Sequence, residues 1–182
     1  SIFDWDIFNT QSQSNAGTRQ SRPEAWAKNI CSVGGYLHRN NTNAGDDSWS
    51  GTGSIGPASD GRIGVSLTGY YDSIFTTSTG SSYTSGFGGT SGATPLVNGM
   101  ANLAIQMFTE GLFGYPGVNW DQRFDAKPHF TTTKALLSAH TAQIAWGRAN
   151  RYQQGWGRPD LQRIYDNRDK MLVLDEEDVL TQ

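Results

Sequence analysis

The sequence of 182 residues has little cysteine, little charge and no long apolar run, and each shortage excludes a class of protein. The single cysteine, Cys31, cannot form an intrachain disulfide, so the chain is not a disulfide-stapled scaffold. Only 17% of the residues are charged, and the 14 Lys and Arg are scattered, which argues against a nucleic-acid partner. No run approaches the roughly 18 apolar residues of a membrane helix, and no signal-peptide pattern occurs, so we expect no membrane association.

Glycine and small polar residues are abundant. There are 22 glycines, together with many Ser, Thr and Asn, which describes a loop-rich chain whose backbone turns often. Extracellular hydrolases often have this composition, so we expect a secreted or extracellular protein. The length suits one compact domain, or a piece of one.

Short apolar runs separated by turn residues predict several β-strands. A polar segment rich in Asn, Gly and Ser over 40–60 reads as a loop. The predicted strands cover 2–13, 30–37, 63–67 and 74–77, and 171–174 is also strand-like before an acidic stretch.

Helical spacing of apolar residues predicts three helices. The first, 94–108, is apolar almost all round and is predicted to be a buried central helix that Pro95 can enter in its first turn. The second spans 132–145, and a third, short helix follows Pro159.

The segment Gly88-Gly-Thr-Ser-Gly-Ala-Thr-Pro95 places a serine at the start of the predicted central helix. A helix N-terminus offers unpaired N–H groups and a positive dipole end, which favour developing negative charge. A serine hydroxyl is a weak nucleophile unless a base and an oxyanion site surround it. Taken alone, Gly-Thr-Ser before a helix is better explained as an ordinary N-cap.

Several motifs in order along the chain resemble those of the subtilisin-like serine proteases. The active-serine signature of that family, Gly-Thr-Ser-x-Ala-x-Pro, is matched by residues 89–95, with Ser91 as its serine. Four further segments are similar to family motifs: Ile30-Cys-Ser-Val-Gly34, Ser54-Ile-Gly-Pro57, Asp60-Gly-Arg-Ile63 and Gln154-Gly-Trp-Gly-Arg-Pro-Asp-Leu161.

The resemblance implies a fold and two site residues. The fold would be the three-layer α/β subtilase architecture with a mainly parallel sheet, incomplete in this chain. Ser91 would be the nucleophile, and Asn15, in the turn Ser14-Asn-Ala-Gly17, would donate its side-chain amide to the oxyanion. Residues 1–168 would form the C-terminal part of the catalytic domain, and 169–182 the start of a C-terminal β extension.

The family places its catalytic Asp and His before the oxyanion asparagine, and no histidine precedes Asn15 here. We therefore expect an N-terminal fragment of the same precursor to supply both groups and a polypeptide to be the substrate. His140 is interpreted as a partly buried structural residue, and His38 and His129 as surface residues. No cofactor is required for this chemistry, metal-binding motifs are missing, and the resemblance leaves room for a structural calcium ion.

Two other hypotheses remain open. The chain could be a non-catalytic subtilase-like module, such as a pseudoprotease or an assembly component. It could also belong to the serine-carboxyl peptidases, which pair the serine with carboxylates, although Asp60-Gly-Arg-Ile63 argues against that family.

Overall fold

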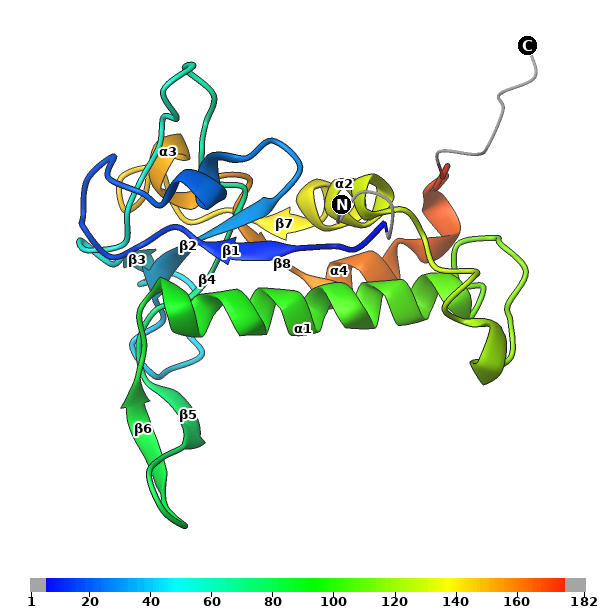
Figure 1. Ribbon diagram of the computed structural model, residues 1–182, viewed down its shortest axis with the longest axis horizontal. Coiled ribbons are helices and arrows are strands. Elements are labelled where there is room, and N and C mark those ends of the chain that lie inside the picture. Colours follow the sequence, from blue (N-terminus) through cyan, green and yellow to red (C-terminus); the bar gives the residue numbers. More distant parts are fainter. Residues whose placement is uncertain (1–5, 176–182) are drawn as a thin grey trace.

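The computed structural model describes residues 6–175, which form a mixed α/β fold (Figure 1). The central strand is β2, Cys31–Leu37, which pairs in parallel with β1, Thr10–Ser12, on one side and with β4, Leu67–Tyr70, on the other. The short β3, Ser48–Trp49, is antiparallel to the end of β2. Six of the seven residues of β2 are buried, as expected for a strand with protein on both faces.

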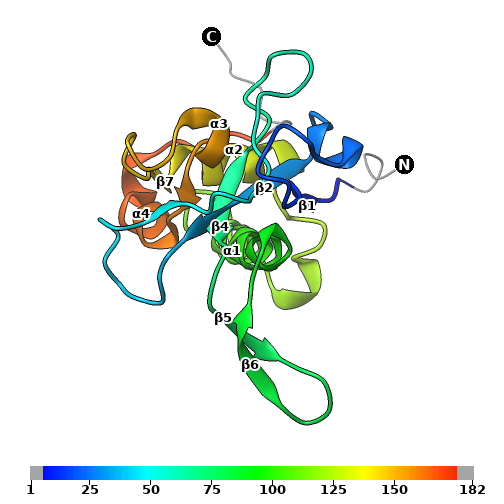
Figure 2. The same ribbon diagram turned by 90° about the vertical axis from the view of Figure 1, so that its left-hand side faces the viewer.

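Two smaller antiparallel ladders complete the β-structure. β5, Ile74–Thr77, and β6, Tyr83–Phe87, form a hairpin that projects from the body of the molecule (Figures 1 and 2). β7, Thr141–Ala142, pairs with β8, Arg158–Pro159.

The longest element is α1, Thr90–Thr109, which packs one face against β1, β2 and β4. The residues on this face are mostly small, so the helix approaches the sheet closely; they include Ala93, Val97, Ala101, Ala104 and Phe108. On the other face Leu96 and Leu103 are 36% and 49% exposed, and they line a groove of about 530 Å³. The expectation of a helix buried all round is therefore wrong for that face.

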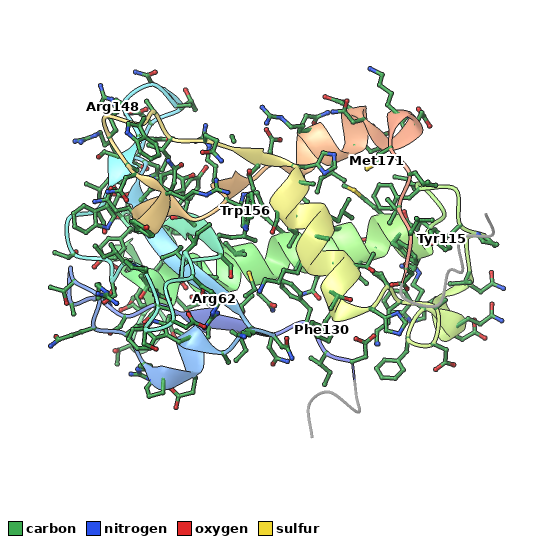
Figure 3. The ribbon with its side chains drawn as sticks, turned by 90° about the horizontal axis from the view of Figure 1, so that it is seen from above. Arg62, Tyr115, Phe130, Arg148, Trp156 and Met171 are labelled. Atoms are coloured by element: carbon green, nitrogen blue, oxygen red, sulfur yellow. The ribbon has the colours of Figure 1, made fainter. Side chains whose placement is uncertain are left out.

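Three further α-helices and three 3₁₀ helices surround this unit. α2, α3 and α4 span Phe130–Ala139, Arg151–Gln154 and Leu161–Asp166, and η1, η2 and η3 span Pro23–Trp26, Trp120–Gln122 and Arg168–Lys170. α2 crosses α1 (Figure 3), and Leu137 of α2 and Ile164 of α4 join the same core as Val97. η1 and α3 contact β2 from the side opposite α1 (Figure 2). No helix in the described part of the chain is long and apolar enough to cross a membrane.

Two carboxylates from distant parts of the chain meet at the N-terminus of α2. Asp6 Oδ1 accepts the Phe130 N–H at 2.9 Å, and Asp175 Oδ1 accepts the His129 N–H at 3.1 Å. Anionic groups are favourable there because the first N–H groups of a helix lack helical acceptors. The two ends of the described chain are thereby joined at one helix terminus.

The predicted strands are only partly confirmed. The strands at 30–37 and 74–77 correspond to β2 and β5, but the prediction of 63–67 is wrong, because β4 starts at Leu67. The strand predicted for 2–13 is reduced to Thr10–Ser12, and its residues 1–5 lie outside the described residues. The segment 171–174 is not a strand; Met171 and Val173 pack against the core instead.

The predicted helices exist, but their boundaries differ. α1 begins at Thr90, four residues before the predicted start, so Pro95 lies inside the helix. α2 ends at Ala139, because His140 leaves helical geometry with φ −115° and ψ 59° and the chain enters β7. The short helix after Pro159 is confirmed as α4. The mixed α/β class is correct; the complete three-layer architecture and a domain boundary at residue 168 stay predictions.

Candidate active site

Ser91 is the second residue of α1, and its side chain is exposed. The residue that caps the helix is Gly89, whose φ of 84° lies in the left-handed region that favours glycine. The N–H of Ser91 belongs to the first turn, whose N–H groups have no acceptor within the helix. Among the described residues it has no other hydrogen-bond partner, so it is free to bind an anion.

The loop that follows β1 brings Asn15 to the residue next to Ser91. Asn15 Oδ1 accepts hydrogen bonds from the backbone N–H of Thr90 at 2.9 Å and from Thr90 Oγ1 at 3.1 Å. Thr90 Oγ1 in turn accepts the N–H of Ser14 at 3.2 Å. Because its oxygen is held in this way, the Asn15 amide has its nitrogen left as a donor, and this side chain is exposed.

The turn that carries Asn15 is fixed by Ser54, which is 1% exposed. The backbone N–H of Ser54 donates to the Ser14 carbonyl at 2.8 Å, and its Oγ accepts the Ala16 N–H at 3.0 Å. The Gly17 N–H donates to the Thr52 carbonyl at 2.7 Å. Ser54 belongs to the Ser-Ile-Gly-Pro segment, so that motif has a local structural purpose.

The start of α1 is also attached to the end of β4. The Gly89 N–H donates to the carbonyl of Tyr71 at 2.7 Å, and the Tyr71 N–H donates to the carbonyl of Tyr36 at 2.8 Å. The phenolic oxygen of Tyr71 accepts the Thr52 hydroxyl at 2.7 Å. These bonds place the first turn of α1 beside the carboxyl ends of β2 and β4.

The three histidines of the chain contact groups other than Ser91. His38 Nδ1 lies 3.2 Å from Asp72 Oδ1, His129 Nδ1 lies 3.0 Å from Asp175 Oδ1, and His140 Nδ1 lies 3.0 Å from the Leu136 carbonyl. The His38 side chain is only 13% exposed, so its interpretation as a surface residue is wrong. Within residues 6–175 no hydrogen bond joins the Ser91 hydroxyl to a general base.

Two further ionisable groups near the sheet, Asp47 and Cys31, are buried. Burial raises the pKa of Asp47, and the Arg158 guanidinium bound to it opposes this shift. Burial raises the pKa of the Cys31 thiol to about 12, so this cysteine is not a nucleophile near neutral pH. In the described part of the chain, no group of three or more His, Cys, Asp or Glu side chains is arranged to hold a metal ion.

The sequence motifs predict Ser91 and Asn15 as site residues but do not indicate the residues that connect them. Thr90 links the two by its backbone and its hydroxyl, and its place inside the Gly-Thr-Ser motif was an available signal. Ser54 lies in the Ser-Ile-Gly-Pro motif, for which the sequence predicts no structural role. Both contacts join residues at least 38 positions apart, which spacing along a single sequence does not reveal.

No protein-family model matches this sequence, and no curated protein sequence does. Solved structures do match its fold. The prenylagaramide maturation protease PagA matches with a TM-score of 0.66 and 15% identity over 90% of this chain. A lanthipeptide protease matches with a TM-score of 0.64 and 16% identity over 91% of this chain.

The CspB protease of Clostridium perfringens matches with a TM-score of 0.58 and 20% identity over 85% of this chain. This chain spans 50%, 52% and 30% of the lengths of the three matched chains. At these identities the likeness concerns the fold alone. The described chain therefore has a fold that is found in solved proteases and that corresponds to about half or less of their length.

Proposed function

We propose that this chain is the C-terminal part of the catalytic domain of a subtilisin-like serine endopeptidase. The observation that carries the proposal is the placement of an exposed serine, Ser91, at the start of α1, directly after the residue that binds the Asn15 side chain. The match of the fold to three proteases supports a proteolytic function in general.

In the proposed reaction Ser91 Oγ attacks the carbonyl carbon of a peptide bond, and a histidine takes the hydroxyl proton. The oxygen of the tetrahedral intermediate accepts hydrogen bonds from the Ser91 N–H and from Asn15 Nδ2. The histidine then gives its proton to the departing amine, which leaves an acyl-enzyme on Ser91. Water, deprotonated by the same histidine, hydrolyses that ester and restores the free serine. No cofactor takes part in these steps.

The histidine and its aspartate would come from an N-terminal part of the same precursor that docks against this chain. Two observations support this: the described residues place no base on Ser91, and the matched proteases are about twice as long or longer. Within the described residues β1 pairs only with β2, which leaves its other edge open to a further strand. Docking there would extend the sheet toward the complete three-layer subtilase architecture.

A polypeptide is the proposed substrate, because all three matched structures are described as proteases. Secretion, an absence of nucleic-acid and membrane partners, and a structural calcium ion remain expectations of the sequence. A second candidate, a non-catalytic subtilase-like module, is favoured because the described residues place no base beside Ser91.

The two candidates are separated by labelling the full-length protein, which means this chain together with the proposed N-terminal part, with a fluorophosphonate probe. This probe reacts only with activated serines. We expect one label per chain, located on Ser91 by peptide mass spectrometry and lost in Ser91→Ala. Ser81→Ala, an exposed serine in the hairpin turn, is the matched control and should label normally. A correctly folded full-length protein that takes no label at Ser91 would establish the non-catalytic module.

A further inference from the structure

The β5–β6 hairpin is attached to the molecule at the residues next to Ser91. Ile74, at its start, pairs with Phe87, at its end. Only two glycines separate Phe87 from the first residue of α1, and the ribbon projects into solvent from that end of the helix (Figures 1 and 2). The base of the hairpin and the first turn of α1 are therefore neighbours in sequence and in space.

The contact between them is made at Gly92, the residue after Ser91. Gly92 is buried inside α1 and does not have a positive φ, so its backbone gives no conformational reason for glycine. Glycine in a helix costs roughly 1 kcal/mol relative to alanine. The reason lies in the hairpin: a Cβ at position 92 would lie 2.4 Å from Ile74 Cδ1 and 3.2 Å from Phe87 Cε1. The two side chains occupy the space that a side chain at position 92 would need.

The remaining sides of the first turn are held by other contacts. Asn15 binds the Thr90 N–H, Tyr71 binds the Gly89 N–H, and Ala93 packs on Gly69, where an added Cβ would lie 3.2 Å from the Ala93 Cβ. The hairpin base covers the side at Gly92. Displacement of the turn toward the hairpin is opposed by Ile74 and Phe87.

We propose that Ile74 and Phe87 are positioning residues for Ser91, which act by packing against Gly92 and so fix where the Ser91 hydroxyl lies. This proposal rests on the proposed function of Ser91. An alanine at position 92 would bring its Cβ to 2.4 Å from Ile74 Cδ1, about 1 Å closer than an ordinary contact, so the first turn of α1 and the end of the Ile74 side chain must move apart. A misplacement of about 1 Å at a reacting group can cost on the order of 100-fold in rate.

The test uses Gly92→Ala, Ile74→Val and the double variant in the full-length protein, with a fluorophosphonate probe. Ile74→Val removes Cδ1, the atom closest to the added Cβ. We expect Gly92→Ala to lower the maximal labelling rate of Ser91 by about 10- to 100-fold, with the half-saturating probe concentration changed less than about twofold. Ile74→Val alone loses the atom that packs on Gly92, so it should lower the maximal rate, but by less than Gly92→Ala does. The double variant should label faster than Gly92→Ala, because the removed Cδ1 leaves room for the added Cβ.

Phe75→Ala is the matched control. Phe75 is 71% exposed and stacks on Tyr83 away from α1, with ring centroids 5.4 Å apart. Truncation of Phe75 should leave the labelling rate of Ser91 unchanged, although it removes a large side chain from the same hairpin. Ile74→Ala adds a second test that does not require the Gly92→Ala variant to fold. Loss of the Ile74 contact with Gly92 should lower the maximal labelling rate of Ser91. A wild-type rate in Ile74→Ala would overturn the proposal.

Each result has one meaning. A wild-type rate in Gly92→Ala, or a loss that Ile74→Val does not recover, would overturn the positioning role while leaving Ser91 as the nucleophile. If the wild-type protein itself takes no label at Ser91, the proposed function fails, and the positioning role fails with it.

Discussion

Asn15 offers the sharpest test of the proposed chemistry, because its two side-chain atoms have separate tasks. Its oxygen accepts two hydrogen bonds from Thr90, whereas its nitrogen is the proposed donor to the oxyanion. Replacement by aspartate keeps Oδ1 and puts an oxygen in place of Nδ2, so the bonds to Thr90 survive but the donor is lost. Replacement by alanine removes both. The pair of variants therefore separates a structural contribution from a catalytic one.

The magnitudes follow from these contacts. Loss of one oxyanion donor lowers kcat by on the order of 100-fold to 1,000-fold, and KM should stay nearly unchanged. Asn15→Ala also loses two hydrogen bonds, each contributing about 0.5–1.5 kcal/mol, so its free energy of unfolding should fall by about 1–3 kcal/mol. Asn15→Asp should unfold within about 0.5 kcal/mol of the wild type, since the acceptor remains.

The assay measures hydrolysis of dye-labelled casein by the full-length protein alongside its thermal unfolding. Both variants should lose activity to a similar, large extent, while only Asn15→Ala is destabilised. Full activity in Asn15→Asp would refute the role of the nitrogen. A loss of activity that follows the loss of stability across the two variants would instead identify Asn15 as a turn former.

Three further predictions concern the support of the site and the core. Ser54→Ala removes the acceptor of the Ala16 N–H and should lower both kcat and the free energy of unfolding, the latter by about 1–3 kcal/mol, measured by denaturant titration. Cys31, with its pKa raised to about 12 by burial, should resist iodoacetamide at pH 8 until the protein is unfolded; rapid alkylation of the native protein would contradict its burial. Leu137→Ala, at a fully buried position, should cost about 2–5 kcal/mol of unfolding free energy by thermal denaturation, and an unchanged Tm would show that the site lies outside the core.

Local patterns predicted part of this structure well. The apolar run of β2 and the helical spacing of α1 each indicated the correct element, and the motif around Ser91 indicated the start of a helix. Boundaries were less accurate. Pro95 suggested a helix starting beside it, whereas the left-handed Gly89 is the true cap and the helix accommodates the proline in its second turn.

Other features depended on contacts that no local pattern encodes. The middle of β6 is Thr-Ser-Gly, which resembles a loop, and the segment becomes a strand by pairing with β5. α2 stops at His140 because the following residues pair with β8, 15 or more positions later. The glycine at position 92 has its explanation in Ile74, which precedes it by 18 positions in sequence.

The meeting of Asp6 and Asp175 at α2 has a topological consequence. The segment 6–175, whose first and last residues are held at one helix terminus, can be placed inside a loop of another protein with little strain, because the host chain resumes close to where it was interrupted. For the same reason, a permuted form of this segment, with a short linker from residue 175 to residue 6 and a new opening in the turn at the tip of the β5–β6 hairpin, should preserve both carboxylate contacts.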